Sequence, residues 1–164
     1  MDDAESARLI RWLADVEAIK QLKHRYCSYC DDSYDADKLT SLFTDDAVWD
    51  GGPIGTHHGR EAIRAFFKGS SKRVSFALHM VMNPVIEVED DRASGNWYLW
   101  QPLVYAFKDG EQAYWLSGRY DDRYLRQADG WKFERVALTL KILAPYTKGF
   151  GEARITNVYG SFKT

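Results

Sequence analysis

The sequence predicts an α+β domain in which three N-terminal helices pack on a strongly curved antiparallel sheet that encloses a pocket. Before Val74, apolar side chains recur at steps of three and four, which is the spacing of helices. From Val74 onward they alternate with polar side chains, which is the period of strands. Helices followed by a run of strands are typical of the α+β class.

The length of 164 residues favours one domain with a sizeable core. We expect a single domain over residues 1–164, with its core over about 10–143. The remaining tail, 144–164, carries glycines and aromatic side chains, and it would close a pocket or contact a neighbouring copy.

The first helix is expected over residues 6–30. Its apolar stripe consists of Leu9, Trp12, Leu13, Val16, Ile19, Leu22 and Tyr26. A short second helix follows, for which Asp35 or Asp37 is a suitable cap. A brief strand is expected over residues 47–49, and Gly59-Arg60 then opens a third helix.

The remaining chain alternates between strands and short turns. Four strand-like runs are expected, over residues 74–89, 94–107, 112–126 and 131–143. Asp-Gly pairs in the last two turns are a strong hairpin signal. Asn83-Pro84 interrupts the first run and indicates a bulge that curves the sheet. A curved sheet wrapped against a long helix leaves a hollow suited to a small molecule.

The composition limits the classes of partner. Aromatic residues make up 15% of the chain, and they require either a large core or an aromatic-lined cavity. The formal net charge is −2 without a basic run, which argues against nucleic-acid binding. No stretch is apolar enough to span a membrane, and the acidic N-terminus is unlike a signal peptide. We therefore expect a cytoplasmic protein with no nucleic-acid or membrane partner.

Residues that could hold a metal or cofactor are sparse. Cys27 and Cys30 have C-x-x-C spacing, but they fall in the last turns of a helix, whereas a redox motif would open one. No second cysteine pair completes a zinc site, and neither a His-carboxylate cluster nor a phosphate loop is present. We expect two buried thiols, no metal and no organic cofactor.

Asp31 and His79 are the candidate catalytic pair. A carboxylate that reaches a histidine orients the ring and stabilises its protonated form, which gives a general base near neutral pH. Asp32 stays open as the partner, and a core histidine bonded to a strand is the structural alternative for His79, which lies in the apolar run 74–82. Tyr26 either packs in the core or donates a hydrogen bond to an oxygen in the pocket.

Several short segments are similar to one known family. They are Val16–Leu22 with Arg25-Tyr26, Leu42–Trp49, Gly59–Ile63 before Phe66, His79 with Asn83-Pro84, and Asp129–Phe133. Over about residues 10–143 the chain resembles the SnoaL-like branch of the nuclear-transport-factor-2-like (NTF2-like) superfamily. The resemblance implies a cone-shaped fold around a pocket, and this fold hosts many activities.

Within the superfamily, the pattern is most similar to bile-acid 7-alpha-dehydratases, with scytalone dehydratases and hexachlorocyclohexane dehydrochlorinases further off. The dehydratase pattern implies that Tyr26, Asp31 and His79 are catalytic. The bile-acid enzymes carry an acidic residue where Gln101 stands. Because glutamine cannot exchange a proton at neutral pH, we expect a different substrate. The dehydrochlorinases carry a lysine at the place of Tyr26.

The residues and the resemblance together predict a cofactor-independent lyase that acts on a hydrophobic aromatic or polycyclic small molecule. His79 would remove a proton, Asp31 would hold the imidazole, and Tyr26 would assist the leaving group. Elimination of water is the first choice. The same base could expel formaldehyde, isomerise a double bond or close a ring. A non-catalytic ligand-binding module is the alternative from another class.

Some of the remaining aromatic side chains are expected to line the pocket, and others to lie on the outer face of the sheet. The candidate substrate-binding residues are Trp49, Trp97, Gln101, Tyr114 and Tyr120. The strands carry apolar side chains on both faces, such as Trp97 and Tyr98, and the predicted helices cannot cover both. We therefore expect a homodimer or homotrimer, as is common among related family members.

Overall fold

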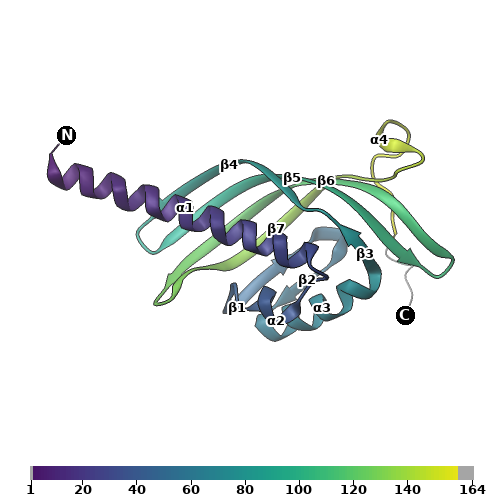
Figure 1. The fold of residues 1–164 in the computed structure, drawn as a ribbon, viewed down its shortest axis with the longest axis horizontal. Coiled ribbons are helices and arrows are strands. Elements are labelled where there is room, and N and C mark those ends of the chain that lie inside the picture. The colour runs from purple at the N-terminus through teal and green to yellow at the C-terminus, as the bar shows by residue number, and fades with distance from the viewer. Residues whose placement is uncertain (1, 159–164) are drawn as a thin grey trace.

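The computed structural model describes residues 2–158, and its first element is the long helix α1, Asp3–Asp31 (Figure 1). The helix begins after Asp2, whose Oδ1 accepts a hydrogen bond from the amide of Glu5 at 2.7 Å. The second half of its predicted stripe is buried, with Ile19 and Leu22 at most 1% exposed. This half of α1 supplies the helix side of the core.

The first half of α1 extends beyond the sheet (Figure 1). Its apolar residues Leu9, Trp12 and Leu13 are 43%, 43% and 52% exposed. The apolar stripe runs along the whole helix in the sequence, but the rest of the chain buries only its second half. Among the described residues, no helix is long and apolar enough to cross a membrane.

Short elements connect α1 to the long strands. They are α2 (Ala36–Thr40), β1 (Phe43–Asp50), the 3-10 helix η1 (Gly52–Ile54), β2 (Thr56–His58) and α3 (Arg60–Arg73). Asp35 caps α2, because its Oδ1 accepts the amides of Asp37 and Lys38. With α4 (Gly149–Glu152) in the tail, the described residues form four α-helices, where the sequence predicts three. Two strands, β1 and β2, lie between α2 and α3, and β1 contains the brief strand predicted over residues 47–49.

The sheet contains seven strands, whose order is β2-β1-β7-β6-β5-β3, with β4 paired to β5 beside this path. After α3 come the short strand β3 (Val74–Ala77) and four long strands, β4 (Met80–Glu89), β5 (Arg92–Phe107), β6 (Gly110–Gln127) and β7 (Gly130–Pro145). The predicted antiparallel hairpins from β4 to β7 are confirmed. However, β1 pairs with β7 in parallel, so the sheet is mixed rather than wholly antiparallel. Such a pairing between distant segments leaves no mark on local periodicity.

The predicted strand over 74–89 is divided into β3 and β4 at Leu78 and His79. Leu78 donates its amide to the carbonyl of Pro102 at 3.1 Å. The amide of His79 instead donates to the two carboxylate oxygens of Asp31, at 3.0 and 3.1 Å. Because this amide leaves the ladder with β5, His79 lies between two strands and not inside one, contrary to the sequence prediction.

The predicted bulge at Asn83-Pro84 is confirmed. The register between β4 and β5 shifts between Met82 and Val85, and Asn83 has a φ of 52°. A proline cannot donate to the ladder, and the extra residue bends the strand locally.

Alternation along β5 separates the two faces of the sheet. Trp97, Leu99 and Leu103 are at most 3% exposed and belong to the core beneath α1 and α3. Tyr98, which points to the other face, is 55% exposed. Figure 1 shows α1 running along one face of the long strands. The core therefore lies between that face and the helices, as the sequence predicts.

The described part of the tail packs on the outer face. The ring of Tyr146 lies 5.5 Å from that of Trp115, and the ring of Phe150 lies 6.3 Å from that of Trp100. Trp100 and Trp115 themselves stack at 5.3 Å. Tyr146 and Phe150 therefore cover part of the sheet's outer face, while Ile155 forms a parallel bridge with Leu143 of β7. The sequence-based expectation that the aromatic tail closes a pocket or contacts a neighbouring copy also involves Tyr159, which lies outside the described residues.

Candidate active site

The structure brings Asp31 and His79 together. Asp31 is the last residue of α1, and His79 occupies the gap between β3 and β4. Asp31 Oδ1 lies 2.6 Å from His79 Nδ1. The side chains of His79 and Asp31 are 6% and 23% exposed, so the contact is shielded from bulk solvent. The side chain of Asp32, by contrast, is 72% exposed, which settles the choice between the two carboxylates.

The contact determines which ring nitrogen of His79 is free. A carboxylate accepts hydrogen bonds only, so Nδ1 carries the hydrogen and Nε2 is left with a lone pair. His79 also lines the internal cavity. An imidazole held in this way has the tautomer that a general base requires. The geometry of the predicted pair is observed, while the catalytic roles stay a prediction.

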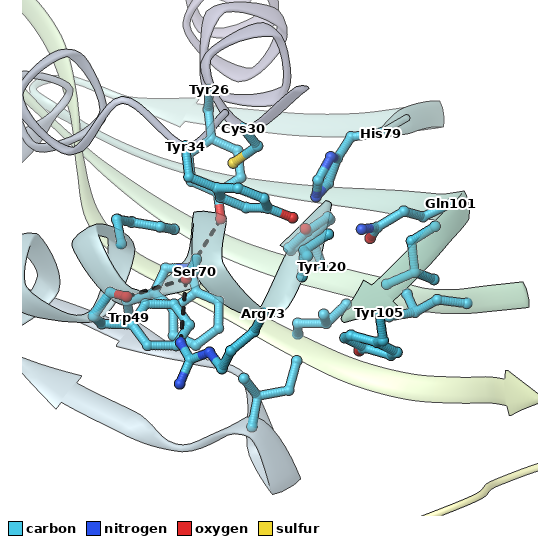
Figure 2. A pocket seen from close by; sticks show the side chains of 17 residues that line it. Tyr26, Cys30, Tyr34, Trp49, Ser70, Arg73, His79, Gln101, Tyr105 and Tyr120 are labelled. Carbon is cyan, nitrogen blue, oxygen red and sulfur yellow. Dashed lines mark hydrogen bonds between the residues drawn. The ribbon is translucent and has the colours of Figure 1, made fainter. Parts of the chain in front are cut away.

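The cavity beside His79 has a volume of about 220 Å³ and is lined mainly by aromatic and aliphatic side chains (Figure 2). Its walls come mainly from α1, α3, β5 and β6. β1, η1, β3 and β7 add one residue each, and Tyr34 and His79 come from the loops. Cavities of this kind, apolar with a few polar groups, are typical small-molecule sites. The volume is below the ~300–1,000 Å³ of most such sites, which favours a compact ligand.

Tyr26 lines the cavity and is 2% exposed. Its hydroxyl accepts a hydrogen bond from Trp49 Nε1 at 2.9 Å. Burial raises the pKa of Tyr26 well above its ordinary value, so the phenol keeps its proton. Its ring also packs edge-on against Phe133 and Tyr120. Tyr26 therefore packs in the core and also reaches the cavity wall, while its donation to an oxygen in the cavity stays a prediction.

Three of the five predicted substrate-binding residues line the cavity, namely Trp49, Gln101 and Tyr120. The Gln101 side chain is buried, and Figure 2 shows it near His79. Among the described residues, neither the Gln101 amide nor the Tyr120 hydroxyl has a hydrogen-bond partner. Both groups are thus available to a ligand.

Trp97 and Tyr114 lie outside this lining, contrary to the prediction. Trp97 is 2% exposed, and its Nε1 donates to the hydroxyl of Tyr124 at 3.1 Å in the core. Tyr114 packs 5.3 Å from Tyr105, near the turn between β5 and β6. Both residues occupy the inner face, but β5 and β6 are longer than the cavity. Alternation predicts the face of a side chain and not its position along the strand.

Tyr34 and Arg73 line the cavity but were not predicted from the sequence. Tyr34 has a φ of 56° in the turn after α1, and its ring lies 6.2 Å from that of His79. Arg73 ends α3 and resembles an ordinary basic residue of a last helical turn. No periodic signal marks either position. The positive φ of Tyr34 becomes visible only in the folded chain.

The two cysteines are free and buried, as the sequence predicts. Burial raises the pKa of Cys27 to about 12, so this thiol is not ionised at neutral pH. Cys30 lines the cavity, and burial raises its pKa as well. Among the residues that the structure describes, no three His, Cys, Asp or Glu side chains gather as metal ligands.

The curved mixed sheet, the helices on one face and the cavity between them define an NTF2-like fold. The chain belongs to the SnoaL-like family. The model of the SnoaL-like domain matches residues 11–137. An uncharacterized protein of Mycobacterium tuberculosis strain H37Rv is 31% identical over 124 residues, which are 75% of this chain and 83% of that protein.

Solved structures share the same fold. A candidate aromatic ring hydroxylase from Novosphingobium aromaticivorans is 30% identical with a TM-score of 0.74, over 86% of this chain and 97% of that one. A candidate scytalone dehydratase from the same species is 22% identical with a TM-score of 0.73, over 82% and 89%. A hexachlorocyclohexane dehydrochlorinase from Novosphingobium barchaimii is 24% identical with a TM-score of 0.72, over 83% and 92%. The last two show a shared fold alone.

Proposed function

We propose that this chain is a cofactor-independent lyase that eliminates water from a compact, largely aromatic small molecule. The observation that carries the proposal is the 2.6 Å contact between Asp31 Oδ1 and His79 Nδ1 in the wall of an aromatic cavity. A histidine oriented by a carboxylate, with its second nitrogen free, is the usual arrangement of a general base.

The elimination proceeds with the base and one donor. His79 Nε2 removes a proton from a carbon atom that a neighbouring carbonyl has made acidic. The electron pair of that C–H bond forms a double bond as the carbon–oxygen bond to the hydroxyl breaks. Tyr26 hydrogen-bonds to the departing oxygen, which leaves as water with the proton returned from the imidazolium. Asp31 stabilises the imidazolium meanwhile, and its own protonation is not required.

The surroundings favour an aromatic substrate. Phe66, Phe67 and Trp49 form part of the cavity wall, and the apolar lining excludes water from the reacting atoms. A cavity of about 220 Å³ suits a compact ring system better than a large polycyclic one. The name of the 30% identical Novosphingobium aromaticivorans protein also points to an aromatic small molecule.

Isomerisation, ring closure and loss of formaldehyde remain chemical alternatives, because each needs the same base and an oxygen-stabilising donor. A non-catalytic ligand carrier would have no use for the contact between Asp31 and His79. A histidine that packed in the core would instead give its ring nitrogens to backbone groups. The enclosed pair therefore favours an enzyme over a binding module.

The test is a screen of hydroxylated aromatic ketones with the mass of each product recorded. We expect loss of the mass of water, whereas loss of formaldehyde or no change in mass would point to the alternatives. Substitution His79→Asn should lower kcat by on the order of 10²-fold or more while the melting temperature is retained. His58→Asn, which changes an exposed histidine, is the matched control and should keep full turnover. Normal turnover by His79→Asn would remove His79 from the mechanism.

A further inference from the structure

Arg73 places a positive charge in the cavity wall. Its Nη2 donates to the hydroxyl oxygen of Ser70 at 3.3 Å, and its Cζ lies 5.3 Å from the ring centroid of Phe66. Within residues 2–158, no Asp or Glu side chain forms an ion pair with it. Figure 2 shows the guanidinium beside Ser70 and Trp49, on the side of the cavity away from His79.

Six other arginines form ion pairs with carboxylates. Arg60 contacts Asp45, Arg64 contacts Asp37, Arg92 contacts Glu134, Arg119 contacts Asp121, Arg126 contacts Asp15, and Arg135 contacts Asp50. The remaining arginines, namely Arg8, Arg11, Arg25, Arg123 and Arg154, form no ion pair within residues 2–158, but all of them are exposed to solvent. A half-buried guanidinium without a counter-ion costs solvation free energy, which an anionic ligand can restore.

The position of Arg73 in α3 has a simpler explanation that does not account for its contacts. Cations in the last helical turn stabilise the C-terminal end of a helix, and Lys72 and Arg73 both stand there. Lys72 serves this purpose from an exposed position. Arg73 lines the cavity instead, and stabilisation of the helix end does not explain why its side chain lies there.

The charge balance of the cavity is one-sided. Its lining includes Arg73 and no Asp or Glu. Asp31 stands behind His79, at the other end, and its carboxylate is engaged by the ring and amide of that residue. An anion would therefore be repelled from the end that holds the base and attracted to the end that holds Arg73.

We propose that Arg73 binds a carboxylate of the ligand, so that the cavity takes compact aromatic acids. The acid group lies at Arg73, and the remainder of the molecule extends toward His79. Ser70 acts as a positioning residue, because its hydroxyl donates to the carbonyl of Phe66 at 3.1 Å and accepts from the guanidinium. The inference rests on the proposed function in taking this cavity as the substrate site.

The test compares an acid with its neutral amide by isothermal titration calorimetry. The probes are cinnamate with cinnamamide, and 2-naphthoate with 2-naphthamide. The wild-type protein should bind at least one acid about tenfold or more tightly than the matching amide. Arg73→Gln should remove this preference and leave amide binding unchanged. Arg73→Lys keeps the charge, so it should keep part of the preference and serves if the glutamine variant does not fold.

The control Lys72→Gln removes a neighbouring charge from the same helical turn and should bind both acids as the wild type does. Equal affinity of the wild type for acid and amide, binding of neither acid, or unchanged acid binding by Arg73→Gln would overturn the proposal. Because binding is measured without turnover, the two proposals fail separately. Acid binding that requires Arg73 without any elimination would contradict the lyase alone. Elimination of water from a substrate that carries a carboxylate, if it is unaffected by Arg73→Gln, would contradict the carboxylate site alone.

Discussion

At the scale of single residues, Asp31 holds His79 at two points. Its carboxylate accepts the backbone amide of His79 at 3.0 Å and contacts Nδ1 at 2.6 Å. The first contact fixes where the residue sits, and the second fixes the ring and its tautomer. One carboxylate at the end of α1 thereby interrupts a strand and orients an imidazole.

Tyr26 is the second residue whose role can be tested by substitution. Its hydroxyl accepts the Trp49 indole hydrogen, so its own hydrogen can be donated either to the Cys30 sulfur or to an oxygen in the cavity. Tyr26→Phe should lower kcat by on the order of 10²-fold, the scale for one lost oxygen-stabilising donor. It should also lower the free energy of unfolding by about 1–3 kcal/mol, because the buried Trp49 N–H loses its acceptor.

Turnover and urea denaturation measure the two effects of Tyr26→Phe separately. Tyr34→Phe is the matched comparison for stability, because the Tyr34 hydroxyl makes no hydrogen bond with the described residues. We expect it to change the free energy of unfolding by less than about 0.5 kcal/mol. A Tyr26→Phe variant with unchanged kcat would reduce Tyr26 to a packing residue.

At the scale of elements, a buried ion pair joins α1 to β6. Lys23 Nζ lies 2.8 Å from Asp122 Oδ2, and both side chains are fully buried. The same Nζ lies 3.3 Å from the ring centroid of Tyr120, a residue that also lines the cavity. Burial raises the pKa of Asp122, and Lys23 acts against that shift. The pair therefore depends on both charges being present.

Lys23→Met should lower the free energy of unfolding at neutral pH by about 3–5 kcal/mol, because it leaves a buried carboxylate unpaired. The loss should be smaller near pH 4. Without Lys23, the ammonium group no longer opposes the effect of burial, so the pKa of Asp122 in the folded state rises further. In the unfolded chain Asp122 ionises near the ordinary value of 3.8. The folded state then binds more protons between these values, so its stability falls as pH rises through that interval.

Urea denaturation at the two pH values measures the effect. Lys20→Met, on the same helix, removes only an exposed contact with Glu17 and should cost less than about 1 kcal/mol. If Lys23→Met lowers the free energy of unfolding equally at both pH values, the prediction that Asp122 becomes protonated in this variant is contradicted.

At the scale of the whole molecule, apolar side chains remain on the outer face of the sheet. Met82 and Tyr98 are directly paired between β4 and β5 and are 43% and 55% exposed. Met80, paired with Trp100, is 41% exposed on the same face. The tail covers Trp100 and Trp115 but leaves this part open. Exposed apolar patches of this kind are common at contacts between proteins.

We propose that two or three copies of the chain associate through this outer face. Light scattering at micromolar concentration should therefore give the mass of a homodimer or homotrimer. Tyr98→Arg places a charge in the contact and should weaken association by on the order of tenfold or more. Lys108→Arg, which keeps the charge of a residue in the turn after β5, should have no effect. A wild-type monomer would contradict the proposal.

The sequence by itself determined the order of the elements and the identity of the candidate pair. Helical spacing before Val74, alternation after it and Asp-Gly turns are local signals, because they arise from contacts between near neighbours in the chain. The bulge at Asn83-Pro84 follows from the same kind of reasoning. Asp31 and His79 could be paired because the family pattern carries their separation.

Only the tertiary structure decided which side chains meet in the cavity. It excluded Trp97 and Tyr114, brought in Tyr34 and Arg73, and paired β1 with β7 in parallel. Alternation assigns a side chain to a face of the sheet, but its neighbours depend on where distant segments cross that face. The division of the strand at His79 has the same origin, since the amide that breaks the ladder is bound by a carboxylate 48 positions away in the chain.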